Sequence, residues 1–307
     1  MFRLVVFFIS ITLGLSPAFA QADIHSATAA SSSIPLRGTL YRIDHGKRSS
    51  WLFGTVHAGQ AAFYPLEPQV MQALHDSDAL VVETDIRNTA AMQQAVLQHG
   101  LYAENDHLGY HLPPAERIQL EQSLADANIP FAHVQRMKPW MIANVLLVHA
   151  MAQAGFPPEQ GLEQHFLQLA ARQHKPVHEL EEAAYALSLF DTMPPSQQRA
   201  YLQETLRELQ DGSGVAKGVA MIHAWQASDT AQLDAEYRNL LTEDSVIARF
   251  TRDMLLDHRN PRMADGIIQL LQNGQTLFVA VGALHLLGPR SIPALLSQHG
   301  YHVTRLY

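Results

Sequence analysis

The sequence contains no cysteine, which excludes disulfide bonds, thiolate-bound metals, cysteine nucleophiles and a lipid-modified N-terminal cysteine. Basic residues are also scarce: 21 Lys and Arg stand against 29 Asp and Glu, and no basic tract offsets the net charge of −8. Because nucleic-acid binding depends on neutralising phosphates, we expect no nucleic-acid partner. With 307 residues, 47% of them hydrophobic, the chain still has ample material for a packed core.

The longest apolar run lies at the N-terminus. Arg3 precedes an apolar stretch over residues 4–15, and residues 18–20 read Ala-Phe-Ala. This layout predicts a secretory signal peptide cleaved after Ala20, because about 12 apolar residues are too few to span ~30 Å of hydrocarbon comfortably. Residues 21–35 are small and polar and predict a flexible leader. We therefore expect a periplasmic or secreted protein with no stable membrane insertion after cleavage.

The remaining residues, 36–307, predict a single domain of the α/β (α+β) class. The expected strands are a hairpin over Thr39–Phe53, then Ala79–Ile86, Pro176–Leu180, Thr276–Val281 and Tyr301–Leu306. The expected helices are Pro68–Leu74, Pro114–Asp126, Pro139–Ala154, Leu162–Gln173, Glu181–Phe190, Pro195–Gln210, Asp229–Leu240, Asp244–His258, Arg262–Gln272 and Ile292–Gln298. The pattern indicates a small central sheet built from both chain ends, with a large helical insertion over about residues 90–273.

Both ends of the chain share one pattern, which is strand, G-x-x-H, helix, strand. The G-x-x-H element is Gly54–His57 in the first copy and Gly282–His285 in the second. A glycine directly after a buried strand permits a sharp turn, and the histidine three positions later lies at the carboxyl edge, where open α/β sheets bind ligands. If the two copies pack side by side, the two histidines meet in one cleft. Rings more than ~10 Å apart would exclude a shared metal ion, whose bonds are ~2 Å long.

Acidic residues end the strand that follows the first copy. Glu83 would point toward the same edge, with Asp85 two positions further on the same strand face. Two imidazoles and one carboxylate suit a divalent metal such as zinc or manganese, which would activate water and polarise a carbonyl. Arg259 and Asn260 lie between two expected helices, where the arginine could stabilise an oxyanion or bind a helix terminus. The alternative is that each histidine only packs at a strand end.

Other catalytic motifs are absent or incomplete. The sequence has no G-x-S-x-G element and no H-E-x-x-H element. Gly212–Gly218 is rich in glycine, but it matches neither phosphate-loop pattern and follows no apolar strand. We interpret it as a loop between two helices.

Taken together, these segments resemble the TraB/GumN family, which is related to PrgY and to the Tiki metalloproteases. The resemblance spans nearly all of the chain after the predicted signal peptide. Its motifs are Trp51–Gly59, Ala79–Asp85, Arg136–Trp140, Gly161–Leu162, Lys175–Val177 with Leu180–Glu181, Arg259–Ala264, and the closing segment from Val279 to Leu306.

The resemblance implies a site made of the two G-x-x-H motifs with Glu83 and an arginine, most simply Arg259. Tiki relatives are metal-dependent proteases, and the wider fold includes erythromycin esterase-like and haem-binding ChaN-like proteins. Two departures from the family pattern could alter substrate choice. Glu163 replaces the usual aspartate after the glycine, and His178–Glu179 replaces a more apolar pair.

We therefore expect a metal-dependent hydrolase of the bacterial cell envelope, with a peptidase as the favoured class and a peptide or small molecule as substrate. His57, His285 and Glu83 would bind a divalent metal (Mn, Co or Zn), with Glu83 as ligand or general base. Arg259 would stabilise an oxyanion or orient Glu83. Two alternatives stay open: a protein that captures a peptide, signal or haem without turnover, and an accessory protein for polysaccharide export with a vestigial site. The metal, the substrate and the oligomeric state are not determined by the sequence.

Overall fold

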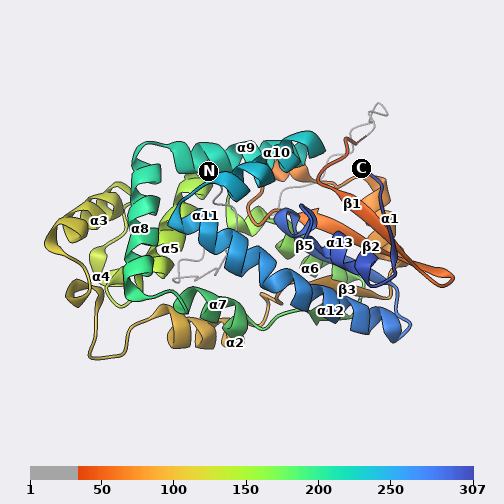
Figure 1. Cartoon of the computed structure of the whole chain (residues 1–307), viewed down its shortest axis with the longest axis horizontal. Coiled ribbons are helices and arrows are strands. Elements are labelled where there is room, and N and C mark those ends of the chain that lie inside the picture. Colours follow the sequence, from red (N-terminus) through yellow and green to blue (C-terminus); the bar gives the residue numbers. More distant parts are fainter. Residues whose placement is uncertain (1–33) are drawn as a thin grey trace, which may run out of the picture.

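Six strands form one mixed sheet at one end of an elongated molecule (Figure 1). The strands are β1 Leu40–His45, β2 Arg48–Thr55, β3 Ala79–Val82, β4 Val177–Glu179, β5 Leu277–Gly282 and β6 His302–Arg305. Their order across the sheet is β4-β3-β5-β2-β1-β6. This computed structural model describes residues 34–307, so the predicted signal peptide and nearly all of the predicted leader lie outside the described residues.

The two G-x-x-H copies pack side by side, as predicted. Strands β2 and β5 are parallel neighbours, with Thr55 beside Gly282, and β3 pairs in parallel on the other side of β5. In the first copy, α1 (Pro68–Asp76) connects β2 to β3; in the second, α13 (Ile292–Gln298) connects β5 to β6. The two copies are therefore interlocked, because β5 separates β2 from β3 in the sheet.

Successive residues of the central strands pack on opposite faces of the sheet, as the period of a strand requires. In β5, Val279 and Val281 contact the smaller apolar cluster, to which α12 (Arg259–Gln272) and α13 contribute. Phe278 and Ala280 face the larger cluster, which continues into the helical insertion. Both faces are covered, which explains the continuous apolar runs of β3 and β5.

The segment between β3 and β5 is mainly helical, which confirms the predicted insertion. Besides α12, its α-helices are α2 Thr89–Ala95, α3 Pro114–Asp126, α4 Phe131–Val134, α5 Pro139–Gln153, α6 Leu162–Arg172, α7 Ala183–Asp191, α8 Pro195–Gln210, α9 Ser213–Gln226, α10 Thr230–Thr242 and α11 Val246–Phe250. Two π-helical segments, η2 Val96–Gly100 and η5 Thr251–Asp257, continue α2 and α11. Proline at the first position begins α1, α3, α5 and α8, where its missing N–H costs no hydrogen bond.

The prediction of a loop over Gly212–Gly218 is wrong beyond its first residue. Gly212 caps the helix with φ of +73°, and α9 begins at Ser213. The glycines lower the intrinsic helix propensity, but Met221, Ile222 and Trp225 on the same helix are all buried. Packing of this apolar face outweighs the propensity of the glycines.

Trp225 joins α9 to the first G-x-x-H strand. Its ring is fully buried between Phe53 and Phe63, at centroid distances of 6.3 and 5.1 Å. Its indole N–H donates to the carbonyl of Gly54 at 2.7 Å. This contact fixes the helical insertion against the strand that ends at the site.

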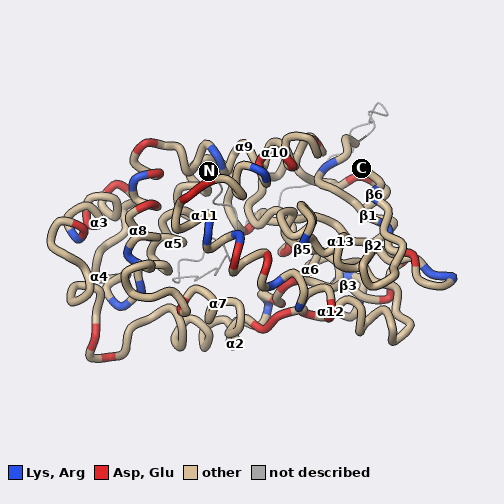
Figure 2. Tube along the Cα trace, in the orientation of Figure 1, with Lys and Arg blue, Asp and Glu red and all other residues tan. Residues whose placement is uncertain are grey.

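Charged residues of both signs are distributed along the described part of the chain, and in the view of Figure 2 the Lys and Arg positions do not gather in one region. Within residues 34–307, every helix is too short or too polar to cross a membrane.

We predict that Trp225→Phe lowers the free energy of unfolding by about 1–3 kcal/mol. The substitution removes a buried donor from the Gly54 carbonyl and leaves part of the indole volume empty. Urea denaturation followed by circular dichroism measures the change. Trp51→Phe, at a half-buried position of β2, is the control and should cost less; equal losses would contradict the prediction.

Candidate active site

The carboxyl ends of three adjacent strands bring the predicted site residues together. His57 follows β2, Glu83 follows β3 directly, and His285 lies in η6 (Ala283–Leu286), the turn after β5. Gly282 lies between them: a Cβ at this position would be 3.6 Å from the His57 Nε2, 3.6 Å from the His285 Cδ2 and 3.1 Å from the Glu83 Oε1. Two atoms that are each 3.6 Å from one point are at most twice that distance apart, so the imidazoles satisfy the ~10 Å limit.

Glu83 is held at both of its oxygens. Oε1 accepts from the Gly282 N–H at 2.7 Å, and Oε2 accepts from Arg259 at 2.7 Å. Only 5% of the side chain is exposed, and burial alone would raise its pKa. In acid, where His285 is also protonated, the charges of His285, Arg259 and His57 and the Gly282 N–H outweigh burial, and they hold the pKa of Glu83 well below its usual range. Glu83 is therefore a carboxylate at neutral pH.

Arg259 lies fully buried between two carboxylates. Its guanidinium binds Glu83, and it also contacts Glu181 through Nε at 2.7 Å and Nη2 at 2.6 Å. Arg259 begins α12, three residues earlier than the sequence pattern predicts. Burial raises the pKa of Glu181, although Arg259 opposes the shift.

Glu181 was not identified as a site residue from the sequence, where it was expected to begin a helix. It instead precedes α7, and its N–H donates to the Glu83 carbonyl at 2.9 Å. One signal was present: Glu181 directly follows the expected strand over Pro176–Leu180, as Glu83 directly follows β3. In the structure β4 ends at Glu179, and Glu181 and Glu83 bind the same guanidinium, that of Arg259.

His285 is oriented by Asn260. The Asn260 amide NH₂ donates to the Arg290 carbonyl at 2.8 Å, so its oxygen faces the His285 Nδ1 at 2.6 Å. Nδ1 therefore carries the hydrogen, and Nε2 presents a lone pair 3.7 Å from the Glu83 Oε1. Burial lowers the pKa of His285 to about 4, so the ring is neutral at pH 7.

His57 is oriented by Glu163, whose Oε1 lies 3.0 Å from its Nδ1. The same oxygen accepts from the Thr55 hydroxyl. Burial opposes a charge on His57, but the Glu163 carboxylate outweighs burial and raises the pKa of His57 to about 9. With 17% of its side chain exposed, His57 is more accessible than His285 or Glu83.

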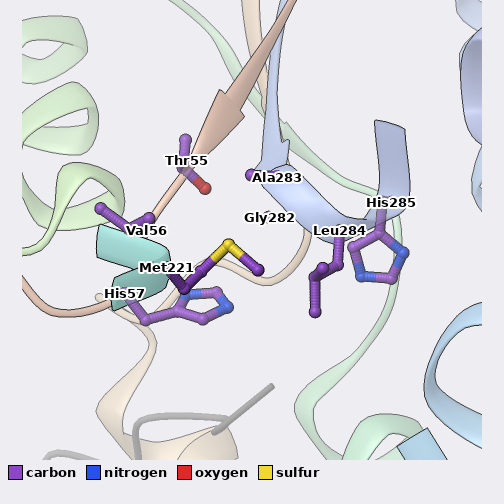
Figure 3. Close-up of a pocket in the computed structure, with 8 residues that line it drawn as sticks. All are labelled: Thr55, Val56, His57, Met221, Gly282, Ala283, Leu284 and His285. Carbon is purple, nitrogen blue, oxygen red and sulfur yellow. The ribbon is translucent and has the colours of Figure 1, made fainter. Parts of the chain in front are cut away.

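A cavity of about 20 Å³ lies between the two G-x-x-H turns. It has room for one water molecule or one metal ion. Besides the two histidines, its lining is mainly apolar. In the view of Figure 3 Met221 lies beside the His57 ring, and Leu284 lies between the two imidazole rings. The helical insertion thus contributes a wall of the cavity through Met221 of α9.

Asp85 does not lie where the sequence analysis placed it. Strand β3 ends at Val82, so Asp85 has no strand face in common with Glu83. Its carboxylate instead accepts from the Arg87 Nε at 2.8 Å. The expectation was wrong because an apolar run followed by acids does not reveal the last paired residue.

The donor chemistry of the site fits a divalent metal. The neutral His285 Nε2 and the Glu83 Oε1 are two acceptors that face each other without a proton between them. His57 and His285 each have a second hydrogen-bonding partner at Nδ1, as metal-bound histidines usually do. In the described part of the chain, however, no three His, Asp or Glu side chains are already grouped closely enough to hold an ion.

Comparison with known proteins identifies the family to which the chain belongs. The model of the TraB/PrgY/gumN family matches residues 39–305, which include the whole sheet and the helical insertion. The chain belongs to this family.

Three relatives have sequences that are 25–28% identical to this chain. The protein YbaP of Shigella flexneri and that of Escherichia coli (strain K12) are each 28% identical over 251 residues, covering 82% of this chain and 89% of YbaP. The metalloprotease TIKI1 of Danio rerio is 25% identical over 307 residues, covering 83% of this chain and 60% of TIKI1. Comparison with solved structures gives no match.

We predict that Arg259→Met destabilises the protein by about 3–5 kcal/mol at neutral pH, because two buried carboxylates lose their shared cation. The folded-state pKa of Glu83 is lowered, so its ion pair contributes above the unfolded-state pKa of about 4.3 and is lost as the pH falls. The difference between variant and wild type should therefore shrink below about pH 4. Urea denaturation at several pH values measures it.

The matched control is Arg262→Met, one turn further along α12. Arg262 is exposed and stacks on Tyr185 at 4.2 Å. Its loss should change the free energy of unfolding by only about 0.5 kcal/mol. Similar effects for both arginines would show that the buried ion pairs do not matter.

Proposed function

We propose that this protein is a metal-dependent hydrolase of the bacterial cell envelope, with a peptidase as the favoured class. One observation carries the proposal: two imidazoles and an ionised carboxylate converge at one sheet edge beside a cavity the size of an ion. The similarity to the metalloprotease TIKI1 supports the same class of reaction. The cell-envelope location follows from the predicted signal peptide.

In this proposal His57 and His285 would hold a divalent metal through Nε2, and Glu83 would be a third ligand or the general base. Because the pKa of His57 is raised to about 9, its Nε2 would release a proton when the metal binds. When bound, the metal supplies Lewis acidity and a water whose pKa is lowered toward ~7. Glu83 stays ionised at its position because Arg259 and the Gly282 N–H bind its oxygens. A carboxylate fixed in this way is ready to bind a cation or to accept a proton.

The sequence left two roles for Arg259, and burial favours one of them. The guanidinium is fully buried and engaged with Glu83 and Glu181, and the residue does not line the cavity. Arg259 therefore acts in this proposal by orienting Glu83.

The cavity also bears on what can react there. Its volume of about 20 Å³ holds one water molecule or one ion, so a substrate group would enter only after side chains that line the cavity move. Movement of the flexible Met221 side chain would widen the space beside His57.

We predict that wild-type protein, stripped with a chelator and reloaded with Mn, Co or Zn, retains about one equivalent of at least one metal. Elemental analysis after desalting measures the content. His57→Ala with His285→Ala should abolish retention, because two of the three donors are lost. The control, His75→Ala with His299→Ala, removes two exposed histidines and should bind as wild type does. Negligible metal in every form would refute the metal site.

We predict that Glu83→Gln lowers turnover of a peptide library by at least about 100-fold, because the amide can neither accept a proton nor bind a metal as a carboxylate does. Substrate affinity should change much less, and calorimetry measures it separately. Glu182→Gln, at an exposed position near the site, is the control. A protein that captures its ligand without turnover has no rate to lose, so binding without cleavage in wild type would favour that alternative.

A further inference from the structure

The N-terminus of α6 fits directly onto the first G-x-x-H turn. The Leu162 N–H donates to the Val56 carbonyl at 3.1 Å. A Cβ on Gly161 would lie 2.3 Å from the His57 carbonyl oxygen, so no larger residue can occupy this position without displacing the backbone. A Cβ on Gly59 would likewise lie 2.0 Å from the Gln160 carbonyl oxygen. These close approaches fix the register between α6 and the turn.

This register places Glu163 behind His57. Glu163 lies in the first turn of α6, where the helix dipole favours a negative charge, and only 11% of its side chain is exposed. Its Oε1 lies 3.0 Å from the His57 Nδ1 and also accepts from the Thr55 hydroxyl. Since an ionised carboxylate can only accept, the His57 Nδ1 must carry a hydrogen. Nε2 is then the ring nitrogen on the side of Gly282.

The second imidazole is oriented in a parallel way. Asn260, in the first turn of α12, accepts from the His285 Nδ1, so each histidine is fixed by the beginning of a helix from the insertion. The partners differ in charge: Glu163 is an acid, and Asn260 is a neutral amide. A carboxylate makes an imidazole a stronger donor to a metal than an amide does.

We propose that Glu163 is a positioning residue of this site, which fixes the Nδ1–H tautomer of His57 and directs Nε2 toward Gly282 and the Glu83 carboxylate. This inference rests on the proposed function in one respect, that the Nε2 atom is used to bind a metal. Glu163 itself does not line the cavity and touches no reacting group. It gives the two histidines unequal strength, with His57 the stronger donor.

The tautomer is tested first, in metal-free protein, by ¹⁵N NMR of the His57 ring in its neutral form. The His57 signals are assigned from their loss in His57→Gln. Wild type should show a hydrogen on Nδ1. Glu163→Gln should populate the other tautomer, because an amide NH₂ can donate to Nδ1. Glu163→Asp keeps the carboxylate and should largely keep the wild-type tautomer. An unchanged tautomer in Glu163→Gln would overturn the proposal.

Metal affinity is the second readout, measured by competition with a chromophoric chelator for the metal that wild type retains best. Glu163→Gln should weaken the affinity by about 10–100-fold, and Glu163→Asp should recover most of it. Glu159→Gln, at an exposed position just before α6, is the control and should bind as wild type does. Urea denaturation of each variant separates these effects from unfolding.

The two readouts separate this inference from the proposed function. If no form binds metal, the hydrolase proposal fails, while the NMR result still decides whether Glu163 orients His57. If wild type binds metal and Glu163→Gln binds it equally well, the positioning role of Glu163 is refuted and the metal site stands.

Discussion

A buried cation between two buried acids links the parts of this protein. Arg259 at the start of α12 binds Glu83 after β3 and Glu181 after β4, and all three side chains are almost completely removed from water. Transfer of such charges from water costs several kcal/mol for each ion, and only close, well-directed partners offset this cost. The chain leaves the sheet after Glu83 and returns with β4 and again with α12, so these ion pairs bind three of its passages to one another. The same contacts keep Glu83 ionised beside the histidines.

The site shows how one sheet edge gives similar side chains different properties. The rings of His57 and His285 both face Gly282, yet burial keeps His285 neutral while Glu163 favours the charged form of His57. Glu83 and Glu181 bind the same guanidinium, yet the pKa of the first is lowered and that of the second is raised. Separation of this kind between like groups is typical of sites that carry out acid–base or metal chemistry.

Much of this arrangement follows from local sequence signals. The paired strand–G-x-x-H patterns predicted that His57 and His285 meet, because strand ends and glycine turns are encoded within a few residues. Proline at helix starts predicted α3, α5 and α8 in the same way. The contacts that could not be predicted join residues distant in sequence. Glu181 accepts a hydrogen bond from Arg259, 78 residues away, and Glu163 accepts one from Thr55, 108 residues away. The helix α9 was missed for a related reason, since its glycines are overruled by packing of Trp225 against β2.

The position of β5 has a consequence for how the molecule is made. The hairpin β1–β2 forms from neighbouring residues, and β3 pairs with β4, which follows about a hundred residues later. These two parts of the sheet are joined only through β5 (Leu277–Gly282), which pairs with both β2 and β3. The edges of β2 and β3 that pair with β5 therefore stay unpaired until nearly the whole polypeptide has been made. Such pairing between residues distant in sequence gives a high contact order, which slows folding. Unpaired edges of this kind promote aggregation, so a nascent chain would benefit from a chaperone until its last strands emerge.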